Sequence, residues 1–355
     1  MRKGTSLIAV ILAVVWIFGC SSTPGARNPS PATATTADAT PAGAGSQAID
    51  ICETLMFPPP PPTRPPAIKP AGESVRVLAF GDYGDGGSRQ KAVADAIAEN
   101  HKKKRFDFGI TLGDNFYQTG LPTPTDPRWA SNWEGMYGGL GIRLYVSLGN
   151  HDYYNPASPI AEAIYSQRSK SWCFPASYYT YTAGPVQFFV LDTDWIMREW
   201  REDRDRDPVK LQRDWLKAQL DASKSTWKVV YGHHPAYSAG QHKNNKPILE
   251  TILPVLRNRA DVYIAGHDHD MQYLKPDGGV EFFVSGAGGH DLRPLSDQRE
   301  RLVWGVGDTA GFSALEADAS SLTVSFFDTK QTELCTVRLI QGKPAQVVKG
   351  CKKES

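Results

Sequence analysis

The chain has 355 residues, with 39 Lys and Arg against 38 Asp and Glu, and its formal net charge is +1. A chain of this length can bury a large core, and 41% of its residues are hydrophobic. Because the charges balance and the basic residues form no stripe, the composition argues against a protein that binds nucleic acid.

Residues 1–19 have the form of a signal peptide. Arg2 and Lys3 precede an apolar run at 7–18 that is too short to span a bilayer. The run ends before Cys20 and resembles a bacterial lipobox, although Phe18 departs from its usual small or branched residue. Acylation of Cys20 would anchor the protein to a membrane by lipid alone. We therefore expect an exported lipoprotein of the bacterial outer membrane or periplasm; the alternative is an ordinary secretory signal.

Residues 20–72 are rich in Ala, Thr, Ser and Pro, with an unbroken proline run at 58–62. Such a segment buries little apolar surface, so it is expected to be a disordered tether. One domain is expected at 73–340, followed by a tail at 341–355.

Four cysteines remain in addition to Cys20, an even number that permits disulfides in an exported protein. Three pairings are possible. Cys335 with Cys351 is favoured because it would pin the tail, which leaves Cys52 with Cys173; free buried thiols are the alternative.

Strands and helices alternate in the first half of the domain, and strands dominate after residue 281. A helix is expected to start at Ser88, as its N-cap. This order predicts an α/β (α+β) protein in which two sheets pack together with helices outside. Strands are expected at 75–80, 106–112, 143–148, 186–191, 227–231, 262–265, 322–327 and 334–339, with further helices at 208–220 and 247–257.

Five of these strands are followed by a Gly and then by metal-type side chains, at 81–84, 113–117, 149–152, 232–235 and 266–269. The carboxyl ends of strands are where α/β sheets build their sites. Five of the eight histidines fall in three of these loops: His151, His233, His234, His267 and His269.

Carboxylates, an amide and imidazoles that converge at one end of a sheet form a metal-binding set, because these donors suit iron, manganese or zinc. Without a cation the carboxylates would repel one another. A single Gly-Asp pair is usually only a turn, but five such loops in this order predict a metal centre.

The motif order resembles the calcineurin-like metallophosphoesterase superfamily over residues 75–339. Gly-Asp-Tyr-Gly at 81–84 and Gly-Asp-Asn-Phe-Tyr at 113–117 resemble the purple acid phosphatases, as does Ser-Gly-Ala-Gly-Gly at 285–289. Gly84 stands where most of the superfamily has a His, and Tyr117 replaces that missing ligand. The single-domain, mammalian (tartrate-resistant) type is most similar in layout. The resemblance implies a four-layer α/β/β/α sandwich of two mixed sheets flanked by helices.

The resemblance also implies two metal ions that share the carboxylate of Asp114. A phenolate ligand favours Fe(III) as the first metal, and the second could be Fe(II), Zn(II) or Mn(II). The first ion would be held by Asp82, Asp114, Tyr117 and His269, and the second by Asp114, Asn150, His233 and His267.

Phosphate monoesters would be hydrolysed at acid pH by a metal-activated hydroxide. His151 resembles the family's substrate-contacting histidine, and His242 lies where mammalian-type members have a candidate general acid; the alternative for His242 is a surface residue. His234 replaces a Tyr of the family and is expected to contact substrate. His101 and His290 are expected to be non-catalytic.

Two other functions stay open, a phosphodiesterase or nucleotidase of the same superfamily and a non-catalytic surface lipoprotein that keeps the fold. The charged run at 198–207 is expected to be a solvated loop, with a lid over the site as the alternative. Trp129, Trp133 and Trp195 are expected to pack in the core rather than to wall a cleft. The protein is expected to be a monomer.

Overall fold

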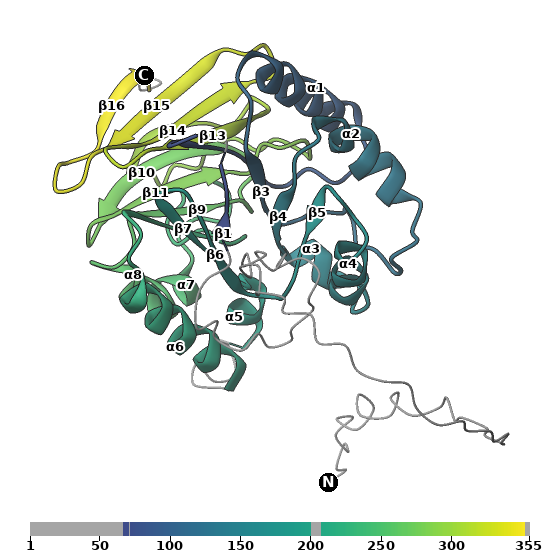
Figure 1. Ribbon diagram of the computed structural model, residues 1–355, viewed down its shortest axis with the longest axis horizontal. Coiled ribbons are helices and arrows are strands. Elements are labelled where there is room, and N and C mark those ends of the chain that lie inside the picture. Colours follow the sequence, from purple (N-terminus) through teal and green to yellow (C-terminus); the bar gives the residue numbers. More distant parts are fainter. Residues whose placement is uncertain (1–66, 71, 200–206, 352–355) are drawn as a thin grey trace, which may run out of the picture. The chain divides into compact units, whose positions relative to one another are not determined.

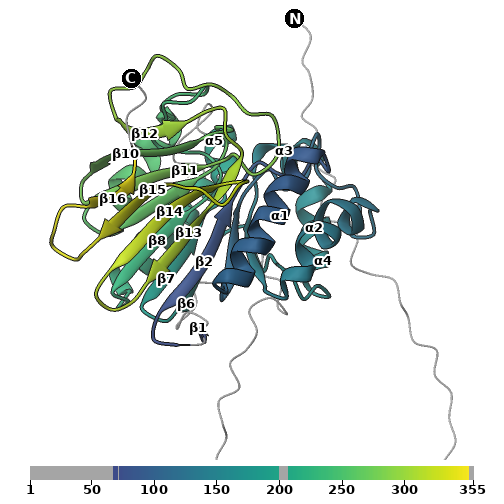
Figure 2. The same ribbon diagram turned by 90° about the horizontal axis from the view of Figure 1, so that it is seen from above.

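The computed structural model describes residues 67–70, 72–199 and 207–351. In these residues two eight-stranded sheets pack against each other, with helices outside both (Figure 1). Helices α1, α2 and α4 lie together on one side of the sheets (Figure 2), while α6, α7 and α8 lie along the other (Figure 1). The expected four-layer sandwich is confirmed.

One sheet contains the first long strand of the domain at its centre. Its strands β2 to β5 run parallel, and β13 to β16 continue the sheet antiparallel from the other edge of β2. In spatial order the strands are β16 (Gln346–Gly350), β15 (Glu333–Leu339), β14 (Leu322–Asp328), β13 (Gly311–Ala317), β2 (Val75–Phe80), β3 (Phe108–Leu112), β4 (Leu144–Ser147) and β5 (Trp172–Cys173).

The other sheet also has a parallel centre, formed by β7, β8, β9 and β11. Antiparallel pairs flank this centre on both sides. The spatial order is β1 (Ala67–Ile68), β6 (Tyr179–Ala183), β7 (Val186–Val190), β8 (Trp227–Tyr231), β9 (Val262–Ala265), β11 (Val280–Ser285), β10 (Met271–Asp277) and β12 (Leu302–Val306).

Several of the helices follow strands whose residues are buried on both faces, as continuous apolar runs require. They are α1 (Ser88–Lys103), α2 (Gly135–Tyr137), α3 (Asn150–Tyr154), α4 (Ser158–Ser166), α5 (Thr193–Glu199), α6 (Asp207–Ala222), α7 (Lys246–Thr251) and α8 (Leu253–Leu256), with a π-helical turn at Trp129–Glu134 and a 3-10 turn at Gly138–Leu140.

Aromatic side chains fill the larger core. Trp133 and Trp172 are fully buried with ring centroids 4.5 Å apart, and Trp129 packs against both Trp172 and Phe116. The expectation that Trp129 and Trp133 are core residues is therefore confirmed. Trp195 is 39% exposed and lies outside both hydrophobic cores.

Three local predictions were wrong. Gly87, not Ser88, is the N-cap of α1, and it makes no side-chain cap bond. The helix expected at 247–257 is divided into α7 and α8 at Ile252. Pro254 accounts for this division, because its ring has no N–H and sterically excludes a continuous preceding turn. Arg198, expected in a loop, lies in α5, and residues 200–206 lie outside the described part.

Two short strands extend the fold beyond the expected domain boundaries. β1 pairs with β6, and β16 pairs with β15. The strand β16 is exposed, and the disulfide between Cys335 and Cys351 holds its end against β15. This disulfide confirms one expected pair. Cys173 is also disulfide-bonded, but its expected partner Cys52 lies outside the described residues.

In the described ranges no helix is long and apolar enough to cross a membrane. The expected signal peptide, Cys20 and almost all of the expected tether lie outside those ranges.

Candidate metal centre

The expected ligands all lie at the carboxyl ends of parallel strands. Asp82 follows β2 and Asp114 follows β3, while Asn150 opens α3 just after β4. His233 follows β8, and His267 and His269 follow β9. Because both sheets present these ends at the same edge of the sandwich, side chains from five separate loops meet there.

The first set of donors converges on the phenol of Tyr117. The Tyr117 hydroxyl lies 2.9 Å from Asp114 Oδ2, 3.4 Å from Asp82 Oδ1 and 3.2 Å from His269 Nε2. His269 Nδ1 donates to the Asp291 carbonyl at 2.6 Å, which directs Nε2 toward the centre. The four expected ligands of the first metal are therefore neighbours.

The second set surrounds His233. Its Nδ1 donates to the Leu112 carbonyl at 2.8 Å, so Nε2 presents a lone pair to the centre. Asn150 Oδ1 lies 3.0 Å from that nitrogen and His267 Nδ1 lies 3.1 Å from it. Asn150 is oriented by donating its Nδ2 hydrogen to the Tyr154 hydroxyl at 3.0 Å.

Asp114 joins the two sets. Its Oδ2 accepts from Tyr117, and its Oδ1 lies 3.4 Å from His233 Nε2. The backbone N–H of His151 donates to the same Oδ1 at 2.9 Å. A carboxylate with one oxygen on each set is placed to bridge two cations.

The backbone at three of these residues is in the left-handed region, which side-chain-bearing residues rarely occupy: φ is 59° at Asp82, 50° at Asp114 and 71° at His267. Such conformations concentrate at functional sites, where surrounding structure enforces them. Gly149 leaves room for this packing, because a Cβ there would lie 2.2 Å from Asp114 Oδ1.

The donor set fits metal ions and is unfavourable without them. Burial, then the neighbouring Asp114 carboxylate, raises the pKa of Asp82 well above its usual value. Burial and the same carboxylate raise the pKa of Tyr117. Burial lowers the pKa of His233 and, further, that of His267, so both imidazoles are held neutral. Lone pairs of His233, Asn150 and Asp114 face one another without a proton between them, as cation ligands do.

Comparison with known proteins agrees with this geometry. The model of the calcineurin-like phosphoesterase family matches residues 75–271. The chain is 31% identical to tartrate-resistant acid phosphatase type 5 of Homo sapiens over 300 residues, which cover 76% of this chain and 92% of that protein. It is 32% identical to purple acid phosphatase 17 of Arabidopsis thaliana over 285 residues, covering 74% and 83% of the two chains.

The chain belongs to the calcineurin-like phosphoesterases, in their purple acid phosphatase branch. It is therefore a metal-dependent phosphoesterase, and its relatives imply a dinuclear metal centre. Among solved structures, the Plasmodium protein GAP50, described as the anchor in the inner membrane complex, has a TM-score of 0.66 at 22% identity, covering 77% of this chain and 90% of that one. That likeness concerns the fold alone.

The two histidines expected to be catalytic flank the centre of the phosphoesterase. His151 lies beside Tyr117, with ring centroids 4.5 Å apart, and its Nδ1 contacts the Gln118 carbonyl at 2.6 Å. His242 stacks on His267 at 4.0 Å, and its Nδ1 lies 2.9 Å from Asp268 Oδ1. The side chain of His242 is 39% exposed, so it lies at the solvent edge of the centre, and both its expected catalytic role and the alternative of a surface residue stay predictions.

His234 is almost fully buried, and its Nδ1 lies 2.9 Å from the Thr193 hydroxyl. Its ring lies 4.4 Å from that of His267, and a donor nitrogen of His234 is close enough to those of His233 and His267 for all three to share an ion. Its expected contact with substrate stays a prediction. His101, by contrast, serves the fold by accepting the Phe106 N–H at the end of α1.

Sequence reasoning missed two residues at the centre. His290 stacks on Tyr117, and Arg293 reaches His242, although both follow the Ser-Gly-Ala-Gly-Gly segment by only a few residues. Their position just after the last motif was the one feature of the sequence that could have indicated a place at the centre. The fold places this loop across the centre, because the His290 N–H donates to the Asp82 carbonyl at 2.9 Å.

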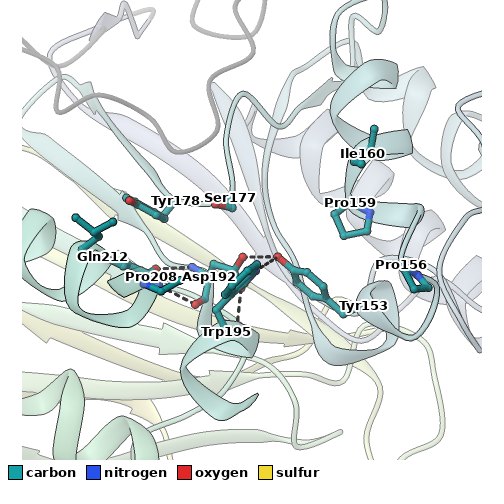
Figure 3. Close-up of a pocket in the computed structure, with 11 residues that line it drawn as sticks. Tyr153, Pro156, Pro159, Ile160, Ser177, Tyr178, Asp192, Trp195, Pro208 and Gln212 are labelled. Atoms are coloured by element: carbon teal, nitrogen blue, oxygen red, sulfur yellow. Dashed lines mark hydrogen bonds between the residues drawn. The ribbon is translucent and has the colours of Figure 1, made fainter. Parts of the chain in front are cut away.

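An apolar cavity of about 520 Å³ lies beside α3, the helix that begins at Asn150. Figure 3 shows Tyr153 next to Trp195 in its lining, with Pro159 and Ile160 on the same side as Tyr153. The Trp195 indole donates to the Tyr153 hydroxyl at 3.0 Å. Trp195 therefore walls a cavity, contrary to the expectation that it packs in the core.

Proposed function

We propose that this phosphoesterase is an exported acid phosphatase that hydrolyses phosphate monoesters. The observation that carries the proposal is the bridging position of Asp114 between two donor sets, one with a phenol and one with an amide and two imidazoles. The proposed ligands are Asp82, Asp114, Tyr117 and His269 for the first metal, and Asp114, Asn150, His233 and His267 for the second.

Tyr117 is the reason to propose Fe(III) in the first position. A phenolate is a hard anionic donor that suits a trivalent ion, and a bound cation removes the phenolic proton despite the raised pKa of Tyr117. The second position would take Fe(II), Zn(II) or Mn(II). When bound, such a pair supplies positive charge for the phosphoryl oxygens and activates the attacking water.

His151 is proposed to bind the phosphoryl group. Its Nδ1 is directed to the Gln118 carbonyl at 2.6 Å, which leaves Nε2 for the substrate. The backbone N–H of His151 is used by Asp114, so the ring is held at a fixed place beside the bridging carboxylate.

His242 is proposed to protonate the leaving oxygen. Asp268 accepts from both the backbone N–H and Nδ1 of His242 at 2.9 Å, which fixes the orientation of the ring. The second nitrogen, Nε2, is on the side of the ring that faces Arg293. His234 is proposed to support substrate binding beside His267.

The proposed location is the bacterial cell envelope, with Cys20 lipidated after removal of residues 1–19 and residues 20–72 acting as a tether. The basis for this part is the sequence alone, since these residues lie outside the described ranges. A membrane contact by lipid only and a monomeric state belong to the same proposal.

The test is phosphate release by the full-length, metal-loaded protein at pH 5 and pH 8. We expect it to hydrolyse an aryl phosphate monoester, faster at pH 5, and to leave a bis-aryl diester intact. Rapid diester hydrolysis would favour the phosphodiesterase alternative, and metal-loaded protein without turnover on either ester would reject the enzyme. The protein should also carry a tyrosinate-to-iron absorption band that Tyr117→Phe removes; a band that persists would reject Tyr117 as the ligand.

A further inference from the structure

The loop at 286–293 fixes the backbone of Arg293 beside the first metal position. Gly288 N–H donates to the Gly81 carbonyl at 3.0 Å, and Arg293 N–H donates to the His269 carbonyl at 3.2 Å. Since Asp82 directly follows Gly81 and His269 is a proposed ligand, these hydrogen bonds attach the loop to the ligand-bearing turns. The backbone position of Arg293 is therefore fixed by hydrogen bonds to the turns that carry the proposed ligands.

The guanidinium reaches across to the second metal position. Its Nη1 lies 3.3 Å from Nε2 of His242, whose ring stacks at 4.0 Å on that of His267. Arg293 thus borders both halves of the centre, on the side of His242.

Arg293 has no carboxylate partner within ion-pair distance in the described ranges. The nearby Asp291 instead faces Arg89, with 3.7 Å between Nη1 and Oδ1. Other arginines that follow use their donors on the fold: Arg299 donates to the Ser296 carbonyl, and Arg301 donates to the carbonyls of Lys275 and Pro276. A solvated surface arginine is the ordinary explanation for a missing partner, but Arg293 is partly buried and borders a catalytic centre.

A guanidinium with unused donors matches the planar geometry of an anionic oxygen pair. A monoester bound at the metal centre has its leaving group on the side of the proposed acid, His242, which Arg293 also borders. We propose that Arg293 makes the enzyme selective for phosphate monoesters whose leaving group carries a second anionic group. This inference rests on the proposed monoesterase function and specifies its substrate class.

The test compares two esters of a primary alcohol, 3-phosphoglycerate and glycerol 3-phosphate, which differ in one carboxylate. The full-length, metal-loaded protein should show about tenfold higher kcat/KM for 3-phosphoglycerate, as one charge-assisted contact in a partly buried site can supply. Raising the ionic strength should reduce that preference. Arg293→Gln should bring the ratio of the two kcat/KM values close to one, and Arg293→Lys should retain part of it. The matched control is Arg299→Gln, which removes an exposed cation a short distance along the chain and should keep the full ratio.

A wild-type ratio of one or less would overturn the inference, as would equal ratios in Arg293→Gln and Arg299→Gln. In both cases hydrolysis of glycerol 3-phosphate would leave the proposed function standing. Failure of the metal-loaded protein to release phosphate from either ester would overturn the proposed function as well. Metal content and Tm, measured for every variant, separate a folding defect from a loss of selectivity, and Arg293→Lys serves if Arg293→Gln does not fold.

Discussion

The phenol of Tyr117 lies face to face with the imidazole of His290, with ring centroids 3.7 Å apart and an interplanar angle of 20°. His290 is itself held in place, because its Nδ1 lies 3.3 Å from Asp85 Oδ2 and its backbone N–H donates to the Asp82 carbonyl. The stack fixes the plane of the proposed phenolate ligand, although the sequence offered no catalytic reason to single out His290.

Replacing His290 by Ala should therefore loosen the first metal site. Mutation of a residue that orients a metal ligand typically lowers metal affinity by about 10-fold to 100-fold. We expect His290→Ala to lower the affinity of the first metal site by about tenfold. Metal titration and the tyrosinate-to-iron band are the measurements. His290→Phe keeps the stacking and should restore most of the affinity; equal behaviour of both variants would show that the stacked ring is not needed.

Gly149→Ala should disable the centre through the bridging carboxylate. The added Cβ would lie 2.2 Å from Asp114 Oδ1 and 2.3 Å from Asp114 N, so the backbone of one of the two loops must move. We expect metal content to fall by more than half and phosphatase activity to fall with it. Gly139→Ala is the control, because apart from the adjacent backbone no atom of the described residues lies within 4 Å of its added Cβ. A fully loaded Gly149→Ala protein would contradict the bridging geometry.

Asp192, which lines the apolar cavity, should make stability depend on pH. Burial raises its pKa from 3.8 to about 7, although Tyr153 donates a hydrogen bond to it. Because the folded state holds this proton more tightly, ionisation opposes folding: stability is intact below pH 4 and decreases as the pH rises through 7. The difference corresponds to roughly 4 kcal/mol at most.

The measurement is the free energy of unfolding between pH 4 and pH 8 for the wild type and for Asp192→Asn. The amide of this variant keeps an acceptor oxygen for Tyr153 but cannot ionise. The free energy of unfolding of the variant should therefore fall less with rising pH than that of the wild type. Asp194 keeps its own raised pKa of about 6, which leaves a smaller residual slope. Parallel curves for the two proteins would contradict the effect assigned to Asp192.

The disulfide between Cys335 and Cys351 should stabilise the edge of its sheet. The two residues are 16 positions apart, and closing a loop of this size in the unfolded chain is worth about 3 kcal/mol. Replacing both cysteines by Ser should lower Tm by several degrees and increase amide exchange in β16, whose residues are exposed. Unchanged exchange would show that strand pairing alone holds β16.

The sequence predicted the parts of the fold in which local pattern and tertiary environment agree. β2, β8 and β9 were predicted with their observed bounds, because each is an apolar run followed by a Gly and a polar loop. The order of the motifs also predicted that seven side chains from five loops lie together, and in the structure their donor atoms are neighbours. Spacing along the chain was informative here because parallel strands end at a common edge.

The rest depended on long-range packing. The stack of His290 on Tyr117 and the contact of Arg293 with His242 are set by the loop at 286–293. This loop joins two strands of one sheet, but it crosses over the turn that follows β2 of the other sheet, to which it is hydrogen-bonded. No periodicity encodes that crossing. Trp195 is a large aromatic residue of the kind that usually packs in a core. It lies at a cavity wall instead, because α5 places it at the molecular surface.

The first half of the active site is built on a strand whose partner is made near the end of the chain. β13 pairs with β2 from Val75 to Ala79, although the matched family region ends at residue 271. During synthesis the turn that carries Asp82 therefore emerges from the ribosome long before the strand that holds it in place. A fragment truncated at residue 271 would leave the edge of β2 unpaired, so metal loading should be an event of the finished chain rather than of the nascent one.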